Sequence, residues 1–176
     1  MKIIARLFML SAILLIPAGL FSQKQIKLGH IDSQKLIMAM PESDSAQKKL
    51  QKVEQEFQAT LEELQVEFNR KFKNYQDNYT TMTELIRSTK ESELNELSER
   101  IQNFQTQAQQ DFERQRVELF RPIQEKAKKA VDEVAEENGF TYIFDIGPGV
   151  GAIVYASPDT EDILPLVKAK LGLTEK

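Results

Sequence analysis

The residue types that carry metal or nucleophilic chemistry are sparse in this chain. It has one histidine, His30, and no cysteine. A zinc site needs three or four nitrogen or sulfur ligands, so His30 has no partners of these kinds with which to form one. We therefore expect His30 to have a structural role, and we expect neither a metal nor a cofactor.

Two carboxylates could in principle act as a general acid and base, namely Asp32 and Asp145. Each follows a short apolar segment that is predicted to be a strand. Aspartates at strand ends commonly cap a helix or accept hydrogen bonds from turn amides. We therefore expect structural roles for both aspartates.

The glycine-rich segment at residues 147–151 resembles a phosphate-binding loop only in its glycines. It lacks the Lys-Ser/Thr ending of such loops. It lies between two apolar segments, which favours a β-turn connection between strands. The sequence predicts no catalytic residue, and an enzyme is the weakest of the functions considered.

The first residues have the layout of a secretory signal peptide. Lys2 and Arg6 precede a mostly apolar run over residues 7–20, and the small residue Ser22 offers a cleavage point. The run is shorter than the ~20 residues that a membrane-spanning helix needs. We expect residues 1–22 to be removed near Ser22, so that the mature protein is periplasmic and has no stable membrane insertion.

The charge balance of the mature chain disfavours nucleic acid as a partner. Without Lys2 and Arg6 the chain has 21 basic and 27 acidic residues, a net charge of −6. Such a surface repels a phosphate backbone. With no cysteine there is no disulfide framework either, so stability must come from packing or association.

The middle of the chain predicts long helices, because residues 42–121 contain no glycine and no proline. Apolar residues recur every eleven positions in both halves of this segment. Eleven residues over three turns is close to the helical period, so the helices should run nearly straight. In the first half the repeat comprises Leu50, Leu61, Phe72, Val53, Leu64, Tyr75, Phe57, Phe68 and Tyr79, and in the second half it comprises the pairs Leu97/Ile101, Ala108/Phe112, Leu119/Ile123 and Ala130/Val134.

The two repeats are separated by Thr80-Thr81-Met82-Thr83, a run of poor helix formers. We predict a turn between Asn78 and Ser88, and hence an antiparallel helical hairpin over residues 42–121 with legs of ~50 Å. One continuous helix in a parallel coiled coil remains the alternative.

The two ends of the mature chain, residues 23–41 and 122–176, predict a small body. Residues 26–31, 140–146 and 152–156 read as strands, and a helix capped by Asp32 or Ser33 stops at Pro41. Pro122 should end or kink the arm helix, which then resumes up to Asn138 with Gly139 as a left-handed cap. Asp162 should cap a terminal helix.

The fold class is thus α+β, with a β-rich body too small to cover its own sheet. An open sheet of this size needs a cover, so we expect homo-oligomerisation. The body residues assigned to this interface are Ile31, Ile143, Phe144 and Val154.

Three segments resemble the Skp (OmpH-like) family of periplasmic chaperones, in the same order along the chain. They are residues 26–42, which contain Lys27-Leu28-Gly29-His30-Ile31-Asp32, residues 122–145, and residues 152–163. The resemblance implies a homotrimer whose strands meet in a small β-barrel and whose three arms surround a cavity. It also implies that unfolded outer-membrane proteins are held there without ATP.

The arm surface outside the two apolar stripes is mostly polar, so contacts with an unfolded client should be weak and multiple. The candidates for such contacts are the off-stripe residues Val66 and Phe120 and the tip residues Met82, Leu85 and Ile86. Scattered surface apolar residues without a function are an equally good interpretation of each one.

Arm charge differs from the basic arms of the best-known family members. Residues 42–120 contain 11 basic and 16 acidic residues, and Lys73, Arg87 and Lys90 are isolated among acids. This argues against lipopolysaccharide binding at a site like that of the family. A structural envelope protein, whose hairpin docks one fixed partner, is the alternative function. It would show one tight stoichiometric partner and no suppression of aggregation.

Overall fold

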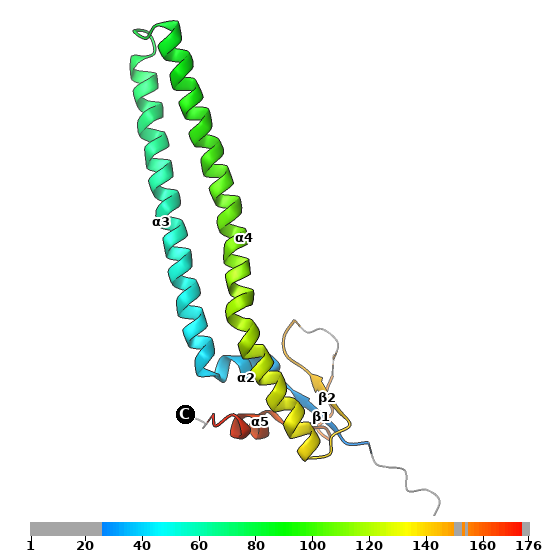
Figure 1. Cartoon of the computed structure of the whole chain (residues 1–176). Helices are drawn as coiled ribbons and strands as arrows, with labels where there is room; N and C mark the ends of the chain where they lie inside the picture. Colours follow the sequence, from blue (N-terminus) through cyan, green and yellow to red (C-terminus); the bar gives the residue numbers. More distant parts are fainter. Residues whose placement is uncertain (1–25, 150–152, 154, 174–176) are drawn as a thin grey trace, which may run out of the picture.

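A computed structural model describes residues 26–149, 153 and 155–173. Two long helices, α3 (Pro41–Asn78) and α4 (Glu84–Glu137), lie side by side and project from a small body at one end (Figure 1). The predicted signal peptide, residues 1–22, lies outside the described residues. At 1.5 Å per residue, the 38 residues of α3 extend roughly 57 Å.

The hairpin is confirmed, and its turn lies within the predicted window. α3 starts with Pro41 in its first turn, where proline is tolerated, and it ends at Asn78. Residues 79–83 form the turn. Its last residue, Thr83, caps α4, because its Oγ1 accepts a hydrogen bond from the Ile86 N–H at 3.4 Å. The continuous-helix alternative is therefore wrong.

Contacts between the two legs show how they are aligned. Phe57 on α3 meets Phe104 on α4 edge to face, with ring centroids 6.2 Å apart. Nearer the tip, Arg100 pairs with Glu67 at 3.0 Å, and the Tyr75 hydroxyl donates to the Glu91 carboxylate. The apolar stripes of the two helices therefore face each other along the arm.

Of the two outcomes expected at Pro122, an end or a kink of the arm helix, the end is wrong, because α4 continues through this proline as one helix of 54 residues. Proline removes one backbone donor from a helix, at a cost of about 3 kcal/mol. The next turns bury Ile123, Ala127, Ala130 and Val134 in the body core, and this packing holds the helix beyond Pro122. Gly139 then has a φ of +69°, the left-handed conformation expected of it.

The body contains a three-stranded sheet in the order β2-β1-β3, comprising β1 (Leu28–Ile31), β2 (Tyr142–Asp145) and β3 (Glu161–Asp162). Both outer strands run parallel to β1. A Cβ atom at Gly29 would lie 2.9 Å from side-chain atoms of both Phe140 and Ile143, so any larger residue would force these side chains to shift.

The strand predicted at residues 152–156 is wrong where the structure describes it. Ile153, Tyr155 and Ala156 belong to no strand, and the third strand lies at Glu161–Asp162 instead. A turn at residues 157–160 precedes it, in which the Thr160 N–H donates to the Ser157 carbonyl at 3.0 Å. The Thr160 hydroxyl also bonds the His30 ring at 2.9 Å, which aligns the chain beside β1. The connection after β2 is therefore not a hairpin, because β2 and β3 both pair with β1.

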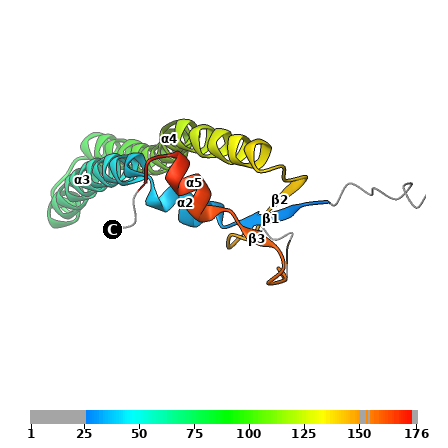
Figure 2. The ribbon, with the colours of Figure 1, turned by 90° about the horizontal axis from the view of Figure 1, so that it is seen from below.

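Two short helices, α2 (Ser33–Ala39) and α5 (Leu164–Lys170), complete the body near the root of the arm (Figure 2). The Asp32 carboxylate caps α2, as expected. At α5 the cap residue is Ile163, while Asp162 accepts from the Leu164 N–H at 2.9 Å. The core is formed by Ile31, Leu36, Met40, Ala46, Ile123, Ala127, Ala130, Val134, Ile163 and Val167.

Titration of Tyr75 tests the pairing of the legs. Its hydroxyl donates to Glu91 and is partly buried, and these effects raise its pKa to about 12. A raised pKa favours the neutral phenol, so the contribution of this contact is present below pH ~10 and is lost as the pH rises through about 12. We expect Glu91→Gln to return the pKa of Tyr75 toward 10, as measured by tyrosinate absorbance with Tyr75→Phe identifying the step.

The matched control is Glu96→Gln, an exposed change on the same helix that should leave this step in place. In a continuous helix Glu91 would be ~24 Å from Tyr75. An unchanged pKa of Tyr75 in Glu91→Gln would therefore contradict the hairpin.

Candidate functional site

Asp32 and Asp145, the two carboxylates considered as a possible acid and base, accept hydrogen bonds within the body. Asp32 Oδ1 accepts from the Lys35 N–H at 2.9 Å, and this bond holds the pKa of Asp32 below its usual value. Asp145 Oδ1 accepts from the Ser33 N–H at 3.1 Å and from the Gly147 N–H at 2.9 Å. Both aspartates are thus acceptors for backbone amides, which is the structural role expected of them.

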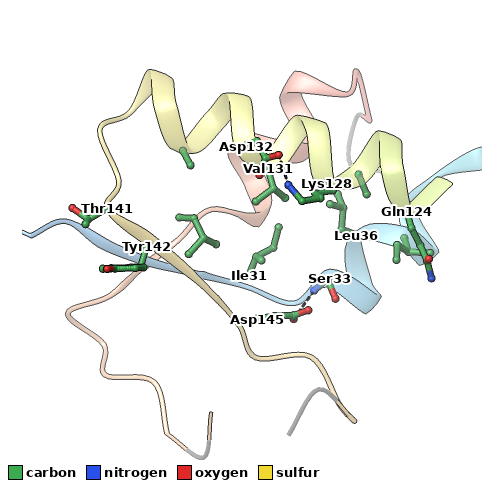
Figure 3. Close-up of a pocket in the computed structure, with 14 residues that line it drawn as sticks. Ile31, Ser33, Leu36, Gln124, Lys128, Val131, Asp132, Thr141, Tyr142 and Asp145 are labelled. Atoms are coloured by element: carbon green, nitrogen blue, oxygen red, sulfur yellow. Dashed lines mark hydrogen bonds and ion pairs between the residues drawn. The ribbon is translucent and has the colours of Figure 1, made fainter. Parts of the chain in front are cut away.

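One pocket, of about 560 Å³, lies on the body between the sheet, α2 and α4 (Figure 3). Its walls are mainly apolar, with Ile31 and Leu36 at the bottom and Val131 from α4 above them. Its charged side chains have partners, because Asp145 accepts from the Ser33 N–H and Lys128 pairs with Asp132. It is a mainly apolar concavity, and no histidine or cysteine is among its lining residues.

The sheet has one covered and one open face. Gly29, Ile31 and Ile143 point toward the core. On the opposite face, Tyr142 is 61% exposed and stacks with Phe144 at 6.3 Å between ring centroids, and Leu28 lies opposite Tyr142 on the neighbouring strand. Leu28, Tyr142 and Phe144 thus place exposed apolar side chains on the open face.

The four body residues assigned to the oligomer interface occupy three different places. Ile31 is buried in the protomer's own core, and Ile143 is half-buried against that core. Phe144 lies on the open face, whereas Val154 lies outside the described residues. Successive side chains of a strand point to opposite faces of the sheet, so the adjacent residues Ile143 and Phe144 could have been assigned to different faces from the sequence.

The apolar stripes of α3 and α4 meet along the arm in a line of contact, which we call the seam, and this seam is only partly covered. Leu50 near the root and Leu94 and Leu97 in the tip half are buried. Between them the apolar residues of both stripes stay half-buried or exposed, and they comprise Val53, Phe57, Leu61, Leu64, Phe68, Phe72, Ile101, Phe104, Ala108 and Phe112. Each stripe is ~100° wide, and one opposing helix covers less than that width, so the edges of large aromatic rings remain in water.

The structure scatters the five predicted contact residues. Leu85 is 79% exposed and Ile86 and Val66 are about half exposed, while Met82 and Phe120 are half-buried. Three of them gather at the tip, and the other two lie at separate levels of the arm. The half-covered seam was missed by the sequence reasoning, although the width of the stripes could have revealed it.

Basic side chains on the arm are largely paired with acids. Arg87 pairs with Glu84 at 3.4 Å, and Lys90 pairs with Glu93 at 3.0 Å. Glu42 on α3 also pairs with Lys126 on α4, which joins the two legs at the root. The arm surface is therefore a mixture of ion pairs and excess acid.

The model of a family described as outer membrane protein (OmpH-like) matches residues 27–171. This chain belongs to the OmpH-like family. The resemblance found in the sequence is thereby confirmed.

A solved structure described as a candidate OmpH-like outer membrane chaperone from Caulobacter crescentus CB15 has the same fold as this OmpH-like chain. Its TM-score is 0.68 at 15% identity, and the match covers 83% of each chain. No curated protein matches the chain. Among the described residues, no group of three or more His, Cys, Asp or Glu side chains is placed to hold a metal ion. None of the helices in that same part of the chain has the length and apolar character to cross a membrane.

Two substitutions on adjacent residues test which sheet face is an interface. Ile143→Asp places a charge against the protomer's core, where it has no partner, so we expect loss of helical circular dichroism. Phe144→Asp places the same charge on the open face, so we expect the protomer to stay folded but to dissociate at micromolar concentration. Mass measurement in solution detects the dissociation of the Phe144→Asp variant. A folded Phe144→Asp variant with the wild-type mass would contradict an interface on this face.

Proposed function

We propose that this OmpH-like protein is an ATP-independent holdase of the bacterial periplasm. As a homotrimer it encloses unfolded outer-membrane and other envelope proteins between its arms and prevents their aggregation. The observation that carries the proposal is the half-covered apolar seam, which runs along a long arm on a small body.

The seam suits a holdase because it offers many small contacts instead of one deep site. Half-exposed side chains such as Phe57, Phe68 and Phe112 each bury little area against a client. Several weak contacts in one enclosed volume retain a client through effective concentration, yet each contact breaks quickly. The client can then rearrange and leave without an energy source.

Assembly into a trimer is supported by the open face of the sheet. Leu28, Tyr142 and Phe144 form an apolar surface on a body whose own core lies on the other side. A second and a third copy would cover these surfaces and hold the arms around a shared cavity. The number three comes from the family resemblance.

Export and charge support the cellular setting. The predicted signal peptide at residues 1–22 directs the chain out of the cytoplasm. Five more acidic than basic residues on the arm disfavour anionic ligands, so we propose clients recognised mainly through apolar contact. Lipopolysaccharide is accordingly not proposed as a ligand.

The direct test is light scattering of a urea-diluted outer-membrane protein in the presence of the mature chain. We expect the mature chain to lower the light scattering of the aggregating client. We also expect protection of large clients to depend on arm length. Deleting residues 61–71 together with 95–105 removes one eleven-residue repeat from each leg and keeps both stripes in phase. This variant should stay helical and oligomeric but lose protection of large clients first.

A deletion of nine residues from each leg is the matched control for phase, because it turns each remaining segment by about 180° and separates the stripes. If the eleven-residue deletion protects large and small clients as well as the full chain, binding resides on the body. If the wild-type chain leaves scattering unchanged but captures a single partner at fixed stoichiometry, the structural docking function replaces this proposal.

A further inference from the structure

The open face of the sheet carries the chain's only histidine. His30 is half-buried on β1, two residues after the exposed Leu28. Its Cα partners across the sheet are Phe144 on β2 and Asp162 on β3. Residues paired in this way have their side chains on the same face of a sheet. The imidazole therefore lies between the apolar side chains of the open face and the edge strand β3.

The hydrogen bonds around His30 determine which of its ring nitrogens carries the proton. The Thr160 hydroxyl has one hydrogen, which it donates to the Ser157 carbonyl at 2.7 Å. The same hydroxyl oxygen lies 2.9 Å from His30 Nδ1, so it must accept a hydrogen bond from an Nδ1–H group. The neutral ring then has its lone pair on Nε2, and a second proton can be added only there.

The acids nearest to His30 in the sheet already bind other groups. They lie on β3 and in the turn before it, and they comprise Asp162, Glu161 and Asp159. Their partners are, in the same order, the Leu164 N–H at 2.9 Å, Lys27 at 3.0 Å and the Ser157 hydroxyl at 3.2 Å. On β2, Tyr142 is a phenol, and Asp145 lines the pocket beside α4. Each of these acids thus has a partner before His30 takes up a proton.

A charge on His30 has different consequences in a single protomer and in an assembly. In the single protomer the open face meets water, which solvates a charged imidazole. When a second copy covers this face, the imidazole loses water among Leu28, Tyr142 and Phe144. Removing a charge from water is costly, and an aromatic ring beside the charge offsets only part of that cost. Covering the open face therefore favours the neutral imidazole.

We propose that His30 makes the assembly of this protein dependent on pH. Further copies cover the open face while the imidazole is neutral, and protonation of Nε2 weakens the contact between the copies. This inference rests on the proposed function, which places the oligomer interface on the open face, and it adds a control of assembly to that function. A fall in pH opens the shared cavity and lets a client leave without ATP.

The test measures assembly of the full mature chain by analytical ultracentrifugation, over a range of protein concentrations at fixed ionic strength. Histidine is the only side chain that ordinarily changes charge between about pH 7.5 and about pH 5.5, and His30 is the only histidine. Assembly must exclude the proton on Nε2, so the contact is strong at the higher pH and is lost as the pH falls. We expect the protein concentration at half-assembly to rise about tenfold between these two pH values.

Two variants separate His30 from other effects of acid. His30→Gln keeps a side chain that can bond Thr160 but takes up no proton, so its half-assembly concentration should change by less than about twofold. His30→Gln with Gln65→His restores one histidine at an exposed position of α3 and should be equally insensitive to pH. The loss of carboxylate charge toward acid pH acts on all three proteins alike. If His30→Gln fails to assemble at neutral pH, His30→Phe gives the same comparison with an apolar side chain.

Equal assembly of the wild type at the two pH values would overturn the inference. Tighter assembly at the acid pH would do so too, because the charged ring would then pair with Asp162. So would a His30→Gln variant that is folded by circular dichroism and weakens toward acid pH as much as the wild type. In these three cases the proposed trimer and its holdase function stand. A wild type that stays monomeric at micromolar concentration and neutral pH contradicts both the trimer and this inference.

Discussion

Apolar contact between the two legs of the arm is the constraint on which the rest of the structure depends. Neither α3 nor α4 can expose its whole stripe to water, and among the described residues the two helices cover each other along the arm. One helix opposite one helix covers a stripe of this width incompletely. The same packing that makes the arm stable therefore leaves a line of half-exposed aromatic side chains along it.

The small body must hold the root of an arm that is much longer than the body itself. α4 extends past the start of α3 and buries Ile123, Ala127, Ala130 and Val134 among residues from β1, α2 and α5. The Glu42–Lys126 pair joins the two legs at the same level. With the core used in this way, the far side of the sheet remains open, and this is the feature that points to assembly.

The arm was largely predictable from sequence because its determinants are local and periodic. The absence of glycine and proline sets the helix length, the eleven-residue repeat sets the buried stripe, and the threonine run sets the turn. The carboxylate of Asp32 likewise follows a local capping rule.

The errors concern features that depend on distant contacts. Continuity through Pro122 depends on core packing that outweighs a local propensity, and β3 has only two residues, which is too short for any periodic signal. Its position depends on the His30–Thr160 contact, which joins residues far apart in the sequence. The exposed edge of the seam was missed because a stripe in a sequence gives no direct measure of how much of it a partner covers.

Hydrogen exchange of the full mature chain, with and without a bound unfolded outer-membrane protein, tests the central claim most directly. We expect the client to slow exchange in the middle of the arm, over residues 53–68 and 101–117, and to leave the strands of the body unchanged. Slowed exchange confined to the strands and the pocket beside them would contradict this account, because it would place the client on the body.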